Sequence, residues 1–491
     1  MAKSERFAYG SVLEALSRGL YPDKRHILRE FVQNSYDSLA EFRRKHPKRQ
    51  LQPIEVKIQA PSIFIADHGL GMSETEIRQY RYLGYSQKER AKHAGFRGIG
   101  KYSALAMAEK IIVDTSPFGA AKRFQVIIHA DRMIADAQQR RNRPLEEILE
   151  ENAEFSNAPA NEDDHYTFVE LHGLSRESAS LLDIDDVRGY LSGTAPVPFD
   201  PQFRHSKEIQ QKLRENIPDF LAVDLMLNGQ PIYKPYFSDC QSPEFETILY
   251  RDDQSDVSAY CWYCQHSEKG QYDPRERAGL VFRVKNIAVG DGQLSRQMLW
   301  KKTPERAFYF FGEIHVLDAD VTPSSDRTVF EDNPARQNLA NRCLRISSNL
   351  NRKAGDESAL RRFDEALDSA VSAISYRERQ MKEGELPLEL KDDIIYEIRT
   401  IQDDIQKRLR GPKNAKTLNR AKRIVGRSRR LIQSLKEAGF LDLAAELKFN
   451  PRLRLLYDSV IEVLREEFRE DPERLERVVR RIHETARTRL K

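Results

Sequence analysis

Cysteine, tryptophan and long apolar stretches are scarce or missing in this sequence of 491 residues. Four cysteines in a chain of this length do not form the dense disulfide framework of a small secreted domain, and they fit a reducing compartment. The sequence has no apolar run of about 18 residues, which argues against a membrane-spanning helix. The first residues, MAKSERFAYGS, lack the apolar stretch of a secretory signal. We therefore expect a soluble, cytoplasmic protein with no membrane partner.

One pair of cysteines raises the question of a metal site. Cys261 and Cys264 are separated by two residues, and His266 follows closely. Zinc usually takes four ligands, and Cys240 and Cys343 have no spacing that completes such a set. The alternative is an ordinary strand, YCWYC, whose aromatic residues alternate with residues on its other face. The sequence favours the strand and leaves metal binding by Cys261 and Cys264 open.

Neither sign of charge dominates the composition. Eighty Lys and Arg stand against 76 Asp and Glu, and the net charge of +4 does not by itself require a nucleic-acid partner. The length and the hydrophobic content of 40% suffice for two or three domains with cores of their own.

A predicted helix over 26–39 carries three polar side chains beside an apolar face. Its apolar residues recur at the 3-4 spacing of a helix and its polar ones follow an adjoining face: Ile27, Leu28, Phe31, Val32 and Leu39 against Glu30, Asn34 and Asp37. Taken alone, this pattern also fits a solvated face or hydrogen-bonded polar groups in a core.

Two glycine-containing segments follow this helix. An apolar strand, 63–66, leads to Asp67, after which Gly69 and Gly71 permit tight turns and a close approach of backbone to a ligand. Later, Gly95, Gly98 and Gly100 precede a predicted helix and leave backbone N–H groups exposed at its N-terminus, where phosphate binds well. Each motif is weak by itself, but the three together in this order indicate a nucleotide site.

The three segments resemble the GHKL ATPases, the superfamily of gyrase B, the ninety-kilodalton heat-shock chaperones, MutL and the MORC proteins. FRGIGKYSALAMAEKIIV is closest in style to the chaperone branch. The resemblance covers roughly residues 5–175 and continues more loosely to about 335. It implies an α+β chain in which a Bergerat-fold two-layer α/β sandwich precedes an α/β transducer domain and an all-α region.

The resemblance assigns roles to individual residues. It makes Glu30 the general base that activates water, Asn34 a ligand of Mg²⁺ on ATP, and Asp67 the partner of the adenine amino group, with Gly71 and Met72 lining the base. Residues 82–94, including Ser86 and Lys88, correspond to the lid. Thr167, in a predicted strand, would face adenine through water or be an ordinary strand residue. The remaining expected nucleotide contacts are Asp37, Gly69, Gly95, Gly98, Ile99, Gly100 and Lys101.

Three domains are predicted: 1–180 for nucleotide binding, 181–335 as transducer and 336–491 as a helical domain. Asn228-Gly229 predicts a type I′ hairpin within the second. By the resemblance, Arg327 in DADVTPSSDRTVFED reaches the γ-phosphate, where a guanidinium can stabilise developing charge. A surface arginine at a turn is the alternative. Lys301 and Lys302 are weaker candidates for the same role.

The helical domain contains a basic segment, 401–436, with twelve Lys or Arg against two acidic residues. Such a segment can follow a phosphate backbone, or it can be the solvated face of a dimerisation bundle. The function we expect is a homodimeric, Mg²⁺-dependent and slow ATPase clamp. It would act on nucleic acid or a nucleic-acid-bound partner, as in MORC or MutL relatives or in bacterial defence. The alternatives are a chaperone-like remodeller of a protein client and a non-enzymatic ATP-binding scaffold. The sequence leaves open whether a separate effector subunit carries out the final chemistry.

Overall fold

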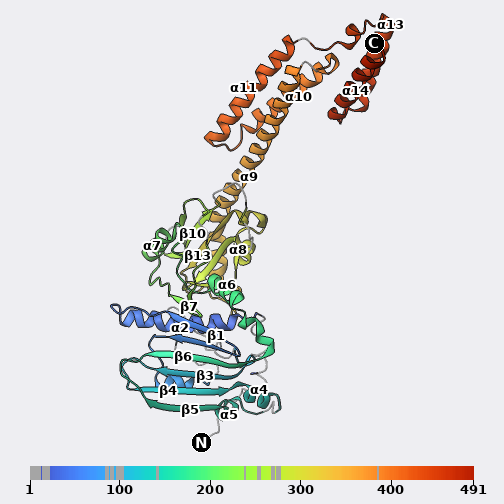
Figure 1. The fold of residues 1–491 in the computed structure, drawn as a ribbon. Coiled ribbons are helices and arrows are strands. Elements are labelled where there is room, and N and C mark those ends of the chain that lie inside the picture. The colour runs from blue at the N-terminus through green and yellow to red at the C-terminus, as the bar shows by residue number, and fades with distance from the viewer. Residues whose placement is uncertain are drawn as a thin grey trace. The chain divides into compact units, whose positions relative to one another are not determined.

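The computed structural model describes residues 13, 23–82, 88, 93–95, 104–139, 143–236, 239–250, 256–266, 271–272, 278–383, 386–438 and 440–490. The chain divides into two compact units, Met1–Asn351 and Arg352–Lys491. The division falls within helix α9, Pro334–Glu383. Figure 1 shows two sheets in the first unit and helices in the second. The expected α+β fold with an all-helical C-terminal region is confirmed.

The first sheet contains eight strands of the described chain in the order β5-β4-β3-β6-β2-β1-β7-β8. Its pairs are antiparallel except β1 with β7, so the sheet is mixed and mostly antiparallel. The strands are β1 Ile54–Gln59, β2 Ser62–Asp67, β3 Ala108–Ser116, β4 Lys122–His129, β5 Ala153–Pro159, β6 Tyr166–Leu174, β7 Leu225–Leu227 and β8 Gln230–Pro231.

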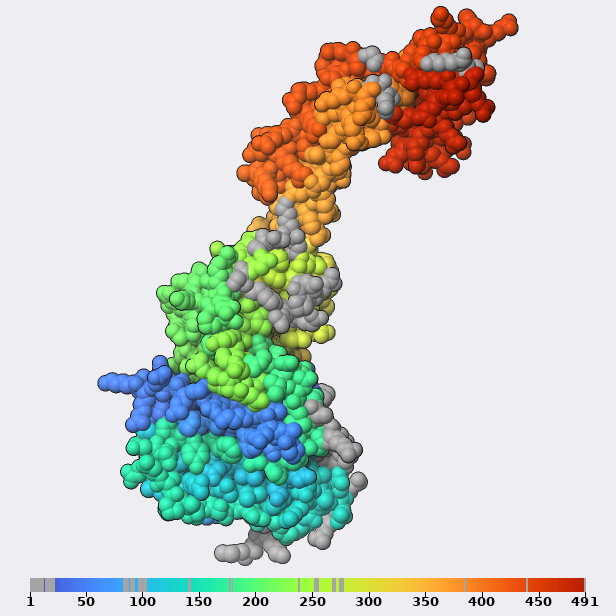
Figure 2. Space-filling model, in the orientation of Figure 1, coloured from blue at the N-terminus to red at the C-terminus, as the bar shows by residue number. Residues whose placement is uncertain are grey.

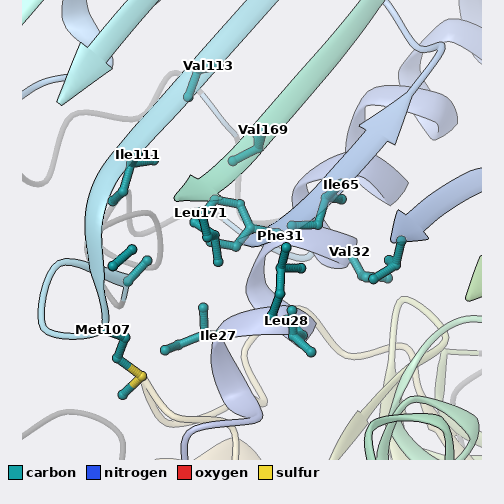
Figure 3. Close-up of a cluster of buried hydrophobic side chains, with 14 of the residues drawn as sticks. Ile27, Leu28, Phe31, Val32, Ile65, Met107, Ile111, Val113, Val169 and Leu171 are labelled. Atoms are coloured by element: carbon teal, nitrogen blue, oxygen red, sulfur yellow. The ribbon is translucent and has the colours of Figure 1, made fainter. Parts of the chain in front are cut away.

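Helix α2, His26–Lys45, supplies the main helical contribution to the core of this sheet. It extends the predicted helix by about two turns, and its predicted apolar face is buried. Figure 3 shows Phe31 and Ile27 of α2 close to Leu171 of β6 and Ile65 of β2. Burial of each such side chain contributes roughly 1.5–3 kcal/mol. The remaining helical elements of this part are α3 Glu74–Gln79, α4 Ala130–Gln139, α5 Leu145–Glu151, η2 Arg176–Leu182 and α6 Ile184–Thr194.

The hairpin at Asn228-Gly229 is confirmed, but it belongs to the first sheet. Both residues have positive φ, 49° and 76°, as a type I′ turn requires. Strand β7 pairs in parallel with β1, and Asn228 accepts a hydrogen bond from the Ile58 N–H through its side-chain oxygen at 2.7 Å. The sequence placed this hairpin in the transducer because local pattern does not show which sheet a strand joins.

Two further segments differ from expectation. Residues 153–159 are mostly polar, yet they form β5, which pairs along β4 after α5. Phe155 of this polar edge strand packs against the core, and Arg78 lies 3.8 Å from the centre of its ring. Residues 104–107 form a turn that ends where β3 begins, whereas the sequence predicted that the glycine-rich segment leads into a helix.

The rest of the first unit is built on a five-stranded sheet of order β12-β11-β13-β10-β9. The strands are β9 Glu244–Leu249, β10 Val257–Gln265, β11 Gly279–Val284, β12 Ile287–Val289 and β13 Phe310–Val316, accompanied by α7 Ser206–Asn216, α8 Gly292–Leu299 and η4 Pro304–Tyr309. Figure 2 shows the blue atoms of α2 against the green atoms of residues that follow α6.

A buried ionic cluster ties this second sheet to the end of α6. The Glu313 carboxylate accepts hydrogen bonds from Lys234 Nζ at 2.7 and 2.9 Å and from Arg283 Nε. Arg283 also donates to the carbonyl oxygens of Ala195 and Gly193, at 3.3 and 3.0 Å. Glu313 accepts three further hydrogen bonds, from Tyr236, Trp262 and His315. Because the carboxylate has this many donors, its charge is compensated although it is fully buried.

The second unit is helical throughout the residues described. Its elements after α9 are η5 Leu388–Leu390, α10 Lys391–Arg408, α11 Ala415–Glu437, α12 Leu443–Glu446, α13 Pro451–Glu467 and α14 Pro472–Leu490. Their apolar residues form one core. None of the helices in the described chain is long and apolar enough to cross a membrane.

Candidate active site

The three polar residues of α2 lie along the helix as predicted, and Asp37 is the most deeply held of them. Only 2% of Asp37 is exposed, and its two carboxylate oxygens accept hydrogen bonds from the N–H groups of Ala94 and Gly95 at 2.8 and 3.0 Å. Glu30 is also buried, and Arg29 Nη2 lies 3.3 Å from its Oε1. Asp37 therefore fixes the start of the glycine-rich segment to α2.

Lys88, from the predicted lid, places its ammonium group against α2. Its Nζ donates to Asn34 Oδ1 and to Asp37 Oδ2, both at 2.9 Å. An internal cation thus contacts the amide oxygen that the resemblance assigns to Mg²⁺. An amide and a carboxylate oxygen are hard donors of the kind that Mg²⁺ prefers, so the donor set fits that ion.

Asp67 lies at the end of β2 with 3% of its surface exposed. Burial raises the pKa of its carboxyl to about 6, and hydrogen bonds from the Gly69 N–H and from the hydroxyls of Ser35 and Ser38 oppose this rise. The Gly69 N–H reaches Asp67 Oδ1 at 3.0 Å. Since both serines lie on α2, this helix and the strand end form one polar site.

Gly69 and Gly71 lie so close to neighbouring atoms that a side chain at either position would clash with them. A Cβ at Gly69 would lie 2.0 Å from Ser38 Oγ. Gly71 has φ of +68°, and a Cβ there would lie 2.0 Å from the carbonyl oxygen of Ser116. The Met72 N–H that follows donates to Thr115 Oγ1 at 2.9 Å. The loop is therefore held tightly between α2 and β3.

Thr167 occupies the centre of this region of the sheet. In the strand register it stands opposite Asp67 of β2 on one side and Thr115 of β3 on the other. Its hydroxyl lies 3.4 Å from Thr115 Oγ1. The structure thus brings Thr167 and Asp67 together, as the resemblance requires. Ser86, Gly98, Ile99, Gly100 and Lys101 lie outside the described residues, and Gly95 is the member of its segment that can be placed.

Arg327 reaches this site although it lies 294 positions after its hydrogen-bond partner Gln33 in the sequence. Its Nη1 donates to Gln33 Oε1 and to the Ala94 carbonyl oxygen, both at 3.1 Å. Its Nη2 donates to the Val284 carbonyl oxygen at 3.3 Å, at the β11–β12 turn. Only 4% of Arg327 is exposed, so it is not the surface arginine that the alternative proposed.

Sequence reasoning missed three residues that hold these groups. Gln33 receives Arg327, and its spacing of four from Asp37 places it on the same face of α2. Arg29 is almost fully buried and donates to the Asp326 carbonyl oxygen at 2.8 Å. Thr115 holds Met72. The i, i+4 spacing signalled Gln33, whereas Arg29 and Thr115 carried no distinctive pattern.

The remaining candidates from the sequence are the cysteines of β10 and the lysine pair beside Trp300. Cys261 and Cys264 are buried in β10, and Cys264 packs in an aromatic core with Tyr260 and Trp262, as the strand alternative predicted. In the described part of the chain, no cluster of His, Cys, Asp and Glu could hold a metal ion. Lys301 and Lys302 are exposed beside the buried Trp300.

The basic segment 401–436 forms the end of α10 and most of α11. Two of its arginines serve the bundle: Arg427 donates from Nε to Glu378 Oε1 at 2.8 Å, and Arg420 pairs with Asp368. Six other basic residues of α11 are exposed: Lys416, Lys422, Arg423, Arg429, Arg430 and Lys436. The sequence could not distinguish these two groups because Asp368 and Glu378 come from a distant helix.

Comparison with known proteins agrees with this geometry. Residues 24–167 match the family described as histidine kinase-, DNA gyrase B-, and HSP90-like ATPases. This range contains Glu30, Asn34, Asp67 and Thr167 and ends before Arg327. The residues that the resemblance assigns to the nucleotide, apart from Arg327, therefore fall within the matched region.

Curated relatives are chaperone proteins named HtpG. The relative from Vesicomyosocius okutanii is 20% identical over 353 residues, which are 66% of this chain and 53% of the relative. That from Ruthia magnifica is 27% identical over 309 residues, 57% of this chain and 47% of the relative. The relative from Alcanivorax borkumensis is 30% identical over 132 residues, 22% of each chain. The chain thus spans about half the length of the curated relatives it matches most extensively. The N-terminal region of this chain is therefore similar to the GHKL superfamily of HSP90-like ATPases.

Proposed function

We propose that this protein is a slow, Mg²⁺-dependent ATPase whose hydrolysis drives a conformational switch. The observation that carries the proposal is Arg327, which donates to Gln33 on α2 and to Ala94 beside the glycine-rich segment. One side chain from the loop after β13 thereby joins the second sheet to the predicted catalytic helix. A guanidinium held there can respond to phosphate charge and transmit the response to the second sheet.

The chain's own groups suit the binding of ATP. Asp67 can accept from the adenine amino group, and Thr167 stands opposite it in the sheet. Glu30 is placed on α2 to take a proton from the attacking water. When bound at Asn34, Mg²⁺ would neutralise phosphate charge and position the nucleotide. Gly95 lies where a Cβ would come 2.6 Å from Gln33 Nε2, which fits a close passage of backbone beside α2.

Lys88 supplies the link between nucleotide binding and movement. Its ammonium group contacts the two oxygens, on Asn34 and Asp37, that would face a bound Mg²⁺ ion. Like charges repel strongly at such distances. We infer that the Lys88 ammonium group leaves Asn34 when the metal-bound nucleotide enters.

The three-domain division, 1–180, 181–335 and 336–491, remains our working proposal for how this switch is arranged. Two copies would form a clamp in which the helical region joins the copies and the nucleotide domains respond to ATP.

Nucleic acid, or a partner bound to it, is the first candidate for what the clamp holds. Lys422, Arg423, Arg429 and Arg430 are exposed along α11, where they can approach a phosphate backbone. A protein client is the second candidate, because the curated relatives are chaperones. In either case a separate effector subunit can carry out the final chemistry.

Steady-state ATP hydrolysis tests the enzyme. We expect Glu30→Ala to retain ATP binding and lose at least 100-fold in kcat, because the general base is removed. Arg327→Ala should lower kcat by a comparable factor. Glu55→Ala and Arg78→Ala are matched controls, since both residues are exposed and take part in surface ion pairs. Turnover that survives Glu30→Ala would refute the assignment of the base.

Binding of a fluorescent DNA duplex at low and high salt tests the first candidate. Arg423→Glu with Arg430→Glu should weaken binding and reduce the salt slope by about 2, while Lys301→Glu with Lys302→Glu should leave both unchanged. Arg427 is left intact because its ion pair with Glu378 supports the bundle. If the wild type ignores DNA in binding and in ATP turnover, the protein-client candidate replaces this one.

A further inference from the structure

Helix α13 presents a row of apolar side chains to solvent. Leu453, Leu456, Val460 and Val463 are 40%, 62%, 42% and 63% exposed. The adjoining side of the helix is already used, since Tyr457 and Ile461 are buried in the core of the C-terminal unit. Aliphatic side chains exposed to this degree, and aligned, usually mark an interaction surface.

The spacing of this row indicates what kind of partner it fits. The four residues follow one another at intervals of three, four and three, which is the a and d pattern of a coiled-coil seam. Such a seam packs against another helix with the same pattern. A nucleic acid or a flat polar surface would offer these side chains no matching apolar contacts.

Charge is distributed unevenly along the same helix. Arg452 lies at the start of α13 and Glu466 near its end, and both are exposed. They flank the apolar row on the side away from the buried Tyr457 and Ile461, and Ser459 lies midway between them. The other two arginines of α13 are engaged within the chain: Arg454 with Asp442, and Arg465 with Asp393. The flank of the row is therefore basic at one end and acidic at the other.

We propose that α13 pairs antiparallel with α13 of a second copy of this chain. Antiparallel pairing about a two-fold axis near Ser459 sets Leu453 level with the second copy's Val463, and Leu456 level with its Val460. It also brings Arg452 to the second copy's Glu466, and symmetry repeats this ion pair at the other end. A parallel pair would instead set arginine beside arginine and glutamate beside glutamate.

The expected strength follows from the length of the seam. Helix α13 has 17 residues and is about 25 Å long. A seam of this size lies at the lower limit of specific interfaces, roughly 1,000 Å² in total. We therefore expect dissociation constants on the order of 1–10 µM without nucleotide. The pairing rests on the proposed clamp for its purpose, but the surface itself does not depend on ATP.

The experiment measures the mass of the full chain in solution, without nucleotide, by sedimentation or light scattering over a wide range of concentration. The wild type should pass from monomer to dimer. Val460→Glu should be monomeric throughout, because it buries charge in the seam. Leu455→Glu is the matched control: Leu455 is 71% exposed on the same helix but points away from the seam, so dimerisation should persist. Circular dichroism verifies that all variants are folded.

A charge exchange tests the direction of pairing. Arg452→Glu and Glu466→Arg should each weaken the dimer about tenfold, and the variant that combines both should recover wild-type affinity. A wild type that stays monomeric, a Val460→Glu variant that still dimerises, or a combined variant that fails to recover would each overturn the proposal. The ATP-dependent rise in melting temperature, measured in parallel on Val460→Glu, reports nucleotide binding separately, so failure of the pairing and failure of the proposed ATPase are distinguishable.

Discussion

Replacing Asp67 with Asn separates what this carboxylate contributes to ATP binding from its effect on stability. Burial raises the pKa of Asp67 to about 6, above the ordinary value of 3.8. The difference corresponds to roughly 3 kcal/mol. Because the pKa of Asp67 is higher in the folded than in the unfolded protein, the stability that Asp67 contributes is complete below pH 3.8. This stability is lost as the pH rises through about 6. Above that pH, the folded protein holds an unfavourable buried charge.

Asparagine removes this charge, so Asp67→Asn should stabilise the nucleotide-free protein in a pH-dependent manner. The gain should be near zero below pH 4, about 1.5 kcal/mol at pH 5 and about 3 kcal/mol at pH 8. With an unfolding entropy of roughly 2.1 cal/mol/K per residue over Met1–Asn351, the melting temperature should rise by about 2 °C at pH 5 and about 4 °C at pH 8.

The same variant should lose ATP binding. The Gly69 N–H selects the carbonyl oxygen of the new amide, and the amide NH₂ then faces the adenine amino group, donor against donor. We expect at least a 30-fold weaker affinity, or about 2 kcal/mol. Differential scanning fluorimetry at both pH values, with and without ATP, measures the two effects together. An equal stability gain at pH 5 and pH 8 would refute the titration of Asp67, and intact ATP binding would refute its role with adenine.

Three further pairs of substitutions test the packing. Gly71→Ala should destabilise the protein by more than about 3 kcal/mol in thermal unfolding, because the new Cβ would clash with the Ser116 carbonyl oxygen. Gly229 also has a positive φ but has open space around it, so Gly229→Ala should cost only about 1–2 kcal/mol. Glu313→Gln should lower the free energy of unfolding by about 3–5 kcal/mol, because it leaves two buried cations without their carboxylate. Lys234→Met should have a smaller effect, because Arg283 still neutralises Glu313. Burial and the nearby Arg283 already lower the pKa of Lys234 to about 7. Arg427→Ala should cost about 0.5–1 kcal/mol and Arg423→Ala less than about 0.5 kcal/mol in urea unfolding, because Arg427 pairs with Glu378 and Arg423 is exposed. Equal effects within any pair would contradict the corresponding contact.

Local pattern was sufficient for much of the fold. The apolar spacing of α2, the strands on either side of Ala60-Pro61 and the Asn228-Gly229 turn all follow from short-range rules, and the structure contains each of them. Pattern was insufficient where pairing decides structure. Residues 153–159 are polar and became a strand because β4 offered them an edge. The hairpin β7–β8 joined β1 rather than the second sheet because a strand's partner is not encoded in its own period.

The candidate site shows the same division. Glu30, Asn34 and Asp37 could be predicted from helical spacing, and Asp67 with its glycines from a strand that ends in a tight turn. The sequence by itself therefore determined which polar residues lie along α2 and at the end of β2, and the roles proposed for them follow from the resemblance. Only the tertiary structure decided that Gln33 receives Arg327, that Lys88 contacts Asn34, and that Arg427 is committed to Glu378 while Arg423 is exposed. The physical reason is that these contacts join residues far apart in the chain, and their energies depend on burial and distance that no local pattern records.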